Sequence, residues 1–196
     1  MKNCKFIKSA SKKTDFILDD KFEVCLIGRS NVGKSSLINA IFNNRTLAKT
    51  SQTPGRTRIV NYFLVDDLFY LVDLPGYGYH KASGEIEKNW STLMEDYFKE
   101  KEDKKLLLFL LDIRHEISED DKNMLKFLNF YSLPFKIIAT KSDKLSKSQR
   151  NNARFSLAKQ TNVGVDDIVF CSSETRENIE LVKNLILEKV KNYEMS

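Results

Sequence analysis

The sequence predicts an α/β protein with one mixed β-sheet and helices on both of its faces. Two observations point to this class. Short hydrophobic runs alternate along the chain with longer segments whose apolar residues recur at helical spacing. Two of the runs, 58–65 and 68–73, are separated only by Asp66 and Asp67, a two-residue turn that predicts an antiparallel hairpin.

The other elements follow in a regular order. Strands are predicted at 23–28, 105–112, 135–140 and 167–172. Helices are predicted at 34–43, 85–100, 118–130 and 147–161, with a last helix that ends near Asn192. Capping-box signals, Ser118 with Asp121 and Ser146 with Gln149, mark the start of two helices. Residues 1–21 show no such pattern and are expected to be a loose basic extension, and residues 22–196 to be a single domain.

Composition excludes several classes of protein. The 196 residues include 32 basic and 27 acidic side chains, a net charge of +5, and 41% are hydrophobic, which excludes a disordered chain. The longest apolar run, 106–111, is far shorter than the roughly 20 residues that cross a bilayer. Cys4, Cys25 and Cys171 are widely spaced and odd in number, as expected for reduced thiols. The chain is therefore expected in the cytoplasm, without a transmembrane segment.

One segment matches a phosphate-binding loop (P-loop) and lies between a predicted strand and a predicted helix. Its residues are Gly28, Arg29, Ser30, Asn31, Val32, Gly33, Lys34 and Ser35. Backbone N–H groups of such a loop surround phosphate oxygens, and the helix N-terminus adds its positive dipole end. Lys34 would reach the β- and γ-phosphates, and the Ser35 hydroxyl would bind Mg²⁺. A chance string in a strand–helix turn is the alternative, which this context disfavours.

A second segment ends the hairpin and consists of Asp73, Leu74, Pro75 and Gly76. Asp73 could reach the shell of a Mg²⁺ ion, and the Gly76 N–H could meet a γ-phosphate. A strand that ends in a Pro-Gly turn would explain the same residues. The position of the segment, one hairpin after the P-loop, favours a γ-phosphate sensor.

A third segment predicts which base is bound, and it consists of Thr140, Lys141, Ser142 and Asp143. The Asp143 carboxylate can accept hydrogen bonds from N1–H and the exocyclic amine of guanine, whereas adenine would leave it unpaired. The stem of Lys141 would pack along the base and join this loop to the P-loop. Ser172 and Ser173 could present a backbone N–H to guanine O6, although a plain turn is the better explanation of the pair taken alone.

These elements, in this order, resemble those of the EngB family (also called YihA or YsxC) of bacterial ribosome-biogenesis GTP-binding proteins, among the TrmE-Era-EngA-EngB P-loop GTPases. The resemblance extends from about Phe22 to the last helix and rests on the strings GRSNVGKSS, TPGRT, DLPGYGY and TKSDK. It implies a three-layer P-loop GTPase fold, whose mostly parallel six-stranded sheet has one antiparallel strand.

The resemblance also implies a function. The protein would bind GTP and slowly hydrolyse it to GDP and phosphate as a Mg²⁺-dependent switch in assembly of the large (50S) ribosomal subunit, and would be needed for normal septation and cell division. Its partners would be GTP, GDP, rRNA and ribosomal proteins, with no DNA, and it would act as a monomer. Two other classes stay open: a small-molecule nucleotide kinase, and a nucleotide-dependent binding module for a division or membrane-associated protein.

The resemblance further assigns switch and catalytic residues. The switches would be 44–58 and 76 to about 83, ordered by GTP and released on hydrolysis. Thr57 would close on Mg²⁺ and the γ-phosphate, although spacing alone does not separate it from Thr50 or Thr53. Its neighbours expected at the nucleotide are Gly55, Arg56, Arg58 and Ile59. The catalytic residues would be Lys34, Thr57 and Gly76.

The chain departs from the general GTPase pattern at two positions. Tyr77 follows Gly76 where many GTPases place a glutamine that orients the attacking water, so intrinsic hydrolysis should be slow. Thr140 stands in place of the more common asparagine. In related GTPases with an asparagine at the position of Asn31, a bound K⁺ supplies the charge of an arginine finger. A loop residue that hydrogen-bonds its own backbone is the alternative for Asn31.

Basic residues suggest where RNA could be contacted. Segment 136–159 holds seven of them, Lys136, Lys141, Lys144, Lys147, Arg150, Arg154 and Lys159. Three share one helix face by spacing, Lys147, Arg150 and Arg154. With them, RNA phosphates could be contacted by Lys2, Lys5, Lys8, Lys12 and Lys13. A solvated helix face and a loose basic tail explain the same residues.

Overall fold

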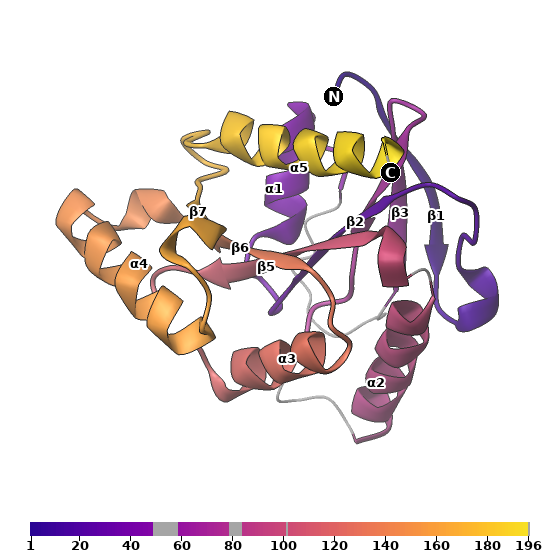
Figure 1. Cartoon of the computed structure of the whole chain (residues 1–196), viewed down its shortest axis with the longest axis horizontal. Helices are drawn as coiled ribbons and strands as arrows, with labels where there is room; N and C mark the ends of the chain where they lie inside the picture. The colour runs from indigo at the N-terminus through magenta and orange to yellow at the C-terminus, as the bar shows by residue number, and fades with distance from the viewer. Residues whose placement is uncertain (49–58, 79–83, 101, 196) are drawn as a thin grey trace.

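The computed structural model describes residues 1–48, 59–78, 84–100 and 102–195, and it shows a central sheet with helices on both faces (Figure 1). The strands are β1 (Cys4–Ala10), β2 (Glu23–Gly28), β3 (Val60–Val65), β4 (Phe69–Asp73), β5 (Lys105–Asp112), β6 (Phe135–Thr140) and β7 (Ile168–Phe170). The α-helices are α1 (Lys34–Phe42), α2 (Gly84–Lys99), α3 (Glu119–Phe130), α4 (Lys147–Thr161) and α5 (Ile179–Glu194). Short 3₁₀ turns are η1 (Lys13–Asp15), η2 (Glu102–Lys104), η3 (Ser142–Lys144) and η4 (Val165–Asp167).

The α/β fold class is confirmed, with one strand more than expected. The strands lie in the order β1-β3-β4-β2-β5-β6-β7. Among the described strands, β3 runs antiparallel to both neighbours and all the others are parallel to one another. The seventh strand is β1, which pairs with β3 along its whole length. Residues 4–10 are therefore part of the sheet, and the expectation of a loose end was wrong for them.

The sheet separates two hydrophobic cores. Helices α1 and α5 pack on one face through residues such as Ile38 and Val182. Helices α2, α3 and α4 cover the other face through Met94, Leu128 and Leu157. Strand β5 is buried on both faces, which explains why its sequence reads as a continuous hydrophobic run.

The parallel strands place the predicted functional segments together. The carboxyl ends of β2, β4, β5, β6 and β7 lie along one edge of the sheet, where ligands bind in open α/β folds. The loops that follow these ends are the P-loop, the Asp73 segment, the loop before α3, the guanine loop (residues 140–143) and the serine loop (which begins with Ser172 and Ser173). In the described part of the chain, no helix has the length and apolar character needed to cross a bilayer.

Candidate nucleotide-binding site

The P-loop connects β2 to α1 in a conformation that depends on its glycines. A Cβ on Gly28 would lie 2.8 Å from the Leu110 carbonyl oxygen and 2.8 Å from Val32 Cγ1, so a side chain there would clash. Gly33 has a φ of +113° and Asn31 a φ of +64°, both in the left-handed region. Among the described residues, no side chain caps the N-terminus of α1, and its first turn has no acidic residue. The first turn can therefore receive an anion.

Asp73 ends β4 with an oxygen that lacks a protein partner. Its Oδ1 atom is buried and forms no hydrogen bond with any described residue. Burial raises the pKa of this carboxyl, and the positive charge of Lys34 opposes the shift. A buried carboxylate oxygen costs free energy until a cation or water satisfies it. Together with the half-buried Ser35 hydroxyl on α1, this oxygen fits the shell of a Mg²⁺ ion carried by nucleotide phosphates.

Gly76 lies directly against the P-loop. The Ser30 N–H donates a 3.0 Å hydrogen bond to the carbonyl oxygen of Tyr77. A Cβ on Gly76 would lie 3.0 Å from Ser30 N and 3.1 Å from Ser30 Oγ. This packing brings the third residue of the P-loop and the expected γ-phosphate sensor together at one end of the site.

The Tyr77 side chain turns into the core. It is 5% exposed and packs against Trp90 and Phe109, with ring centroids 6.4 and 6.5 Å away. Its hydroxyl donates a 2.7 Å hydrogen bond to Asp121 Oδ1. Burial raises the pKa of Tyr77 far above its ordinary value, and the Asp121 carboxylate adds to the shift. Because the ring is committed to these contacts, Tyr77 cannot take the place of a water-orienting glutamine.

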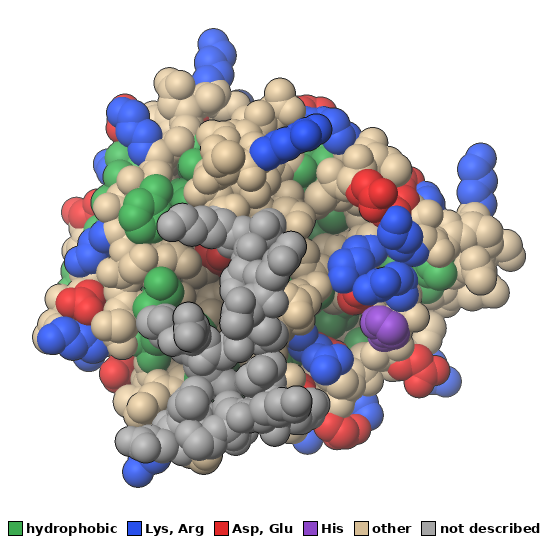
Figure 2. All heavy atoms as spheres, turned by 180° about the vertical axis from the view of Figure 1, so that it is seen from behind, with side chains coloured by type: hydrophobic (Ala, Val, Ile, Leu, Met, Phe, Trp, Pro, Cys, Tyr) green, Lys and Arg blue, Asp and Glu red, His purple; other side chains and the backbone are tan. Residues whose placement is uncertain are grey.

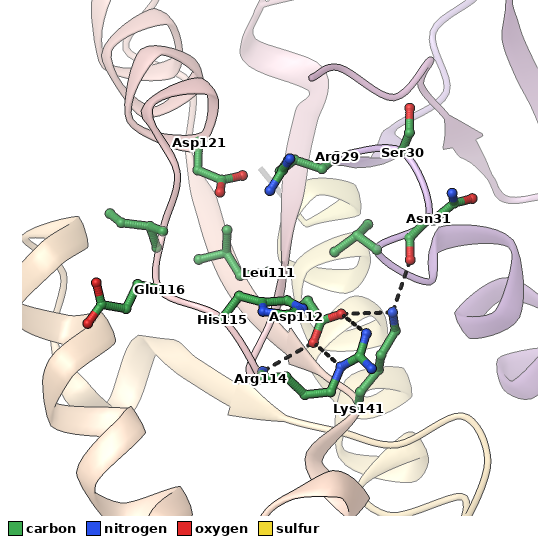
Figure 3. Close-up of a pocket in the computed structure, with 12 residues that line it drawn as sticks. Arg29, Ser30, Asn31, Leu111, Asp112, Arg114, His115, Glu116, Asp121 and Lys141 are labelled. Carbon is green, nitrogen blue, oxygen red and sulfur yellow. Dashed lines mark hydrogen bonds and ion pairs between the residues drawn. The ribbon is translucent and has the colours of Figure 1, made fainter. Parts of the chain in front are cut away.

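Two side chains join the guanine loop to the P-loop, as expected for Lys141. Thr140 Oγ1 lies 2.8 Å from the carbonyl oxygen of Val32 and 3.1 Å from that of Leu111. Lys141 Nζ donates to the Asn31 carbonyl oxygen at 3.1 Å and to Asp112 Oδ2 at 2.8 Å (Figure 3). The hydroxyl of Thr140 thus provides a link between the two loops.

Asp143 is held ionised at the predicted base site. The Ser172 hydroxyl donates to its Oδ1 at 2.6 Å, and Lys144 Nζ lies 2.9 Å from its Oδ2. These two contacts, the serine first, lower the pKa of Asp143 below its ordinary value. The carboxylate can therefore accept hydrogen bonds from N1–H and the amine of guanine.

The serine loop differs from the expectation at one atom. The Ser172 N–H already donates to the carbonyl oxygen of Glu177 at 3.1 Å, so it is not free to bind guanine O6. That contact would fall to the N–H of Ser173. The Glu177 carboxylate also accepts from the Ser142 hydroxyl at 2.6 Å and from Arg150 at 2.5 Å. Glu177 thus contacts both base-binding loops, through its carbonyl oxygen with Ser172 and through its carboxylate with Ser142. Sequence reasoning missed this residue.

A cavity of about 640 Å³ opens between the P-loop end of α1 and these two loops. Its lining includes all of the expected base-site residues except Ser142. The lining residues are Val32, Gly33, Ser36, Asn39, Ala40, Asn43, Arg45, Arg114, Thr140, Lys141, Asp143, Lys144, Ser172, Ser173, Glu174 and Arg176. The size and the converging polar groups suit a nucleoside.

A smaller pocket of about 250 Å³ lies beside the P-loop (Figure 3). At its centre, Arg114 contacts Asp112 through two hydrogen bonds of 2.9 and 2.7 Å. Burial alone would raise the pKa of Asp112, but the hydrogen bonds from Arg114 and Lys141 outweigh it and lower the pKa. Asp112 was not predicted, although its place at the end of a strand on the ligand-binding edge was a signal. On this side of the molecule, Lys and Arg side chains gather beside a histidine (Figure 2).

The first switch is only partly within the described residues. Thr50, Thr53, Gly55, Arg56, Thr57 and Arg58 lie outside them. Ile59 is half-buried and directly precedes β3. At the start of the segment, the Asn39 side chain on α1 donates to the Ala48 carbonyl oxygen at 2.9 Å and accepts from its N–H at 2.8 Å. The segment is therefore anchored to α1 as far as Ala48. Tyr79, in the second switch, also lies outside the described residues.

The basic residues of segment 136–159 are mostly paired within the protein. Lys136 pairs with Asp167, and Lys144 with Asp143 and Glu174. On α4, Arg150 pairs with Glu177, and Arg154 lies 4.9 Å from the centre of the Phe170 ring. The two arginines on this face of α4 are therefore half-buried against the domain, whereas Lys147 on the same face is exposed.

The N-terminal lysines lie elsewhere. Strand β1 and helix α4 are at opposite ends of the sheet (Figure 1), so the two basic segments do not form one surface. Lys2, Lys5 and Lys12 are exposed and form no ion pair with any described residue, whereas Lys13 lies 2.8 Å from Glu100. Lys5 and Lys8 stand opposite Leu64 and Tyr62 of β3, on either side of a bulge.

Comparison with known proteins agrees with this site. Residues 23–141 match the family model described as "50S ribosome-binding GTPase". The chain is 44% identical over 193 residues to the probable GTP-binding protein EngB of Fusobacterium nucleatum, covering 98% of this chain and 99% of the relative. It is 43% identical to the probable EngB of Pelotomaculum thermopropionicum over 187 residues, 95% of this chain and 94% of that one.

Solved structures show the same fold. A crystal structure of a probable GTP-binding protein EngB superposes with a TM-score of 0.68 at 23% identity, covering 87% of this chain and 99% of that one. Era in complex with MgGDPNP and nucleotides 1506–1542 of 16S ribosomal RNA superposes with a TM-score of 0.63 at 18% identity, covering 85% of this chain and 56% of Era.

Proposed function

Because the chain belongs to the EngB family of GTP-binding proteins, which are GTPases, we propose that it acts as a Mg²⁺-dependent GTP switch in assembly of the large (50S) ribosomal subunit. The observation that carries the proposal is the family match over residues 23–141, which spans the P-loop, the Asp73 segment and Lys141. The proposal includes a cytoplasmic location, a monomeric protein and a requirement in normal septation and division. A small-molecule kinase receives no support from these relatives.

The site geometry supports each part of GTP binding. The P-loop N–H groups and Lys34 would hold the phosphates, and the ionised Asp143 would select guanine. Mg²⁺ would be held by the hydroxyls of Ser35 and Thr57, with Asp73 near its shell. When bound, the ion neutralises charge on the β- and γ-phosphates. The Gly76 N–H would bind the γ-phosphate. Because Tyr77 is hydrogen-bonded to Asp121, a movement of Gly76 on binding would be transmitted to α3.

Asn31 is the residue that we propose for a K⁺ ion. Its backbone carbonyl accepts from Lys141, but its exposed side chain forms no hydrogen bond with the described residues. This observation does not support the alternative, in which the side chain bonds its own backbone. We expect faster GTP turnover in K⁺ than in Na⁺ buffer at equal ionic strength, and a loss of the difference in Asn31→Ala. Equal rates in the two buffers would refute the K⁺ site.

For the ribosomal contact, the lysines on and beside the edge strand β1 are better placed than those near α4. The exposed lysines of β1 and its flanks are available for phosphates, and Lys8 and Ala10 lie beside Tyr62 and Val60 at the start of β3. Strand β3 directly follows the first switch. RNA bound along β1 would therefore sit next to the segment whose conformation depends on the nucleotide.

Sedimentation with separated ribosomal subunits tests the proposal. We expect the protein to sediment with the large subunit in a non-hydrolysable GTP analogue, less so in GDP, and less at higher salt. Lys34→Ala should lose the nucleotide dependence, and Lys5→Ala with Lys8→Ala should weaken binding more than Lys159→Ala on α4. Binding to neither subunit, with GTP binding intact, would contradict the ribosomal role. It would favour a division or membrane-associated protein as the partner.

A further inference from the structure

We propose that the Ser30 hydroxyl positions the attacking water in GTP hydrolysis. The proposal rests on the assignment of the P-loop to GTP made above. It starts from the Tyr77 side chain, which follows Gly76 but is buried and bound to Asp121. A different group must therefore hold the water at the γ-phosphate.

Ser30 lies where such a group is needed. Its Oγ is 3.1 Å from the position of a Cβ on Gly76, and its backbone N–H is fixed to the Tyr77 carbonyl oxygen. The Gly76 N–H is expected at the γ-phosphate, so a hydroxyl packed against this glycine lies at the same end of the nucleotide. Ser30 is half-buried, and its Oγ forms no hydrogen bond with a described residue. The hydroxyl is thus free to bind water.

The charged side chains near Ser30 are directed elsewhere. Arg29 and Lys141 line the pocket beside the P-loop, where Arg29 extends toward Asp121 (Figure 3). In the same view the Ser30 side chain points away from the group formed by Asp112 and Arg114. The Oδ1 atom of Asp73 is buried, and the Asp73 carboxyl interacts with the charge of Lys34. The three atoms nearest to the position of a Cβ on Gly76 all belong to Ser30, and one of them is its Oγ.

The chemistry requires no permanent proton transfer to Ser30. The water oxygen bonds to the γ-phosphorus, and the bond from that phosphorus to the β–γ bridging oxygen breaks, with its electron pair left on GDP. The protons of the water remain with the released phosphate and solvent. Ser30 Oγ accepts a hydrogen bond from the water and so aligns its lone pair with the phosphorus.

Single-turnover GTP hydrolysis by purified Ser30 variants tests the role. We expect Ser30→Ala to hydrolyse GTP at least about tenfold more slowly, a smaller loss than removal of an oxyanion donor causes. Ser30→Gly should be equally slow, because the lost group is the hydroxyl. Affinities for GDP and for a non-hydrolysable GTP analogue should stay within about twofold, since the interaction is made in the transition state. The control is Ser148→Ala, an exposed serine of α4.

Three results would overturn the inference. A normal rate in Ser30→Ala would exclude a role for the hydroxyl, and a faster rate in Ser30→Gly would show that the side chain obstructs the reaction. Failure of the GTP assignment on which the inference rests looks different, because the unmodified protein would then bind no GTP. A fall in affinity equal to the fall in rate would also count against Ser30 as a water-positioning residue.

Discussion

The Tyr77 hydroxyl and the Asp121 carboxylate are joined by a 2.7 Å hydrogen bond that connects the residue after Gly76 to the start of α3. The other oxygen of Asp121 accepts from the N–H and the hydroxyl of Ser118, at 2.8 and 2.7 Å, and so completes the capping box of that helix. One buried carboxylate thus serves both the helix cap and the second switch. Movement of Tyr77 would remove a hydrogen-bond donor from the Asp121 carboxylate, which caps α3.

Tyr77→Phe should lower the free energy of unfolding by about 1–3 kcal/mol, because it leaves Oδ1 of the buried Asp121 without its donor. GTP turnover should change little, since the Tyr77 side chain is packed in the core against Trp90 and Phe109. Urea unfolding and a phosphate-release assay measure the two effects. Tyr131→Phe, whose hydroxyl forms no hydrogen bond with described residues, is the matched control. An unchanged stability together with slow turnover would contradict this description of Tyr77.

Thr140→Val should weaken GDP binding and lower the free energy of unfolding by about 1–3 kcal/mol. Its hydroxyl contacts the carbonyl oxygens of Val32 and Leu111, and valine keeps the shape while removing the donor. Thr140→Ser keeps the hydroxyl and should bind GDP nearly as the unmodified protein does. Calorimetric titration of GDP distinguishes the variants. Equal affinities for valine and serine would show that the hydroxyl does not link the loops.

Asp112 should contribute stability that is lost in acid. Its pKa in the folded protein is lowered, so the contribution is present above its unfolded pKa of about 3.9 and disappears as pH falls through the folded pKa. Asp112→Asn should therefore be less stable than the unmodified protein at pH 7, and the difference should shrink toward pH 3. Denaturant unfolding at both pH values, with the exposed Asp166→Asn as control, measures it. A difference that is independent of pH would disprove the ion-pair explanation.

Trp90 should report the state of the second switch. Its Nε1 donates to the carbonyl oxygen of Pro75 at 3.2 Å, so it contacts the segment that leads to Gly76. We expect its fluorescence to differ between the GDP form and the form with a GTP analogue. Lys34→Ala, which should not bind either nucleotide, provides the control. Identical spectra in two saturated nucleotide states would show that this contact does not change.

The sequence predicted the central elements because their signals are local. Strands β5 and β6 and helix α4 have the expected bounds, since a continuous hydrophobic run marks a strand buried on both faces and a capping box marks the start of α4. Helix α3 begins one residue later than expected because Ser118 is its N-cap. The P-loop and guanine loop were found for the same reason, as short strings next to predicted strands.

Features that depend on long-range pairing were missed. Strand β1 mixes lysines with exposed Phe6 and Ile7, and only its pairing with β3 makes it a strand. The ion pair between Asp112 and Lys141 joins the ends of two strands, which no local pattern shows. The same holds for Tyr77, whose burial depends on α2 and α3. The sequence placed Tyr77 at the position where many GTPases have a water-orienting glutamine, and the fold placed its ring in the core.

Guanine selection by Asp143 is the measurement that tests the account most directly. Asp143→Asn replaces the acceptor for N1–H and the amine of guanine with an amide that can pair with the 2-oxo group of xanthine. Titration of GDP and XDP into both proteins should show a strong preference for GDP in the unmodified protein and a reversed preference in the variant. Unchanged GDP affinity in a folded Asp143→Asn protein would contradict the assignment of the guanine loop, and with it the nucleotide site described above.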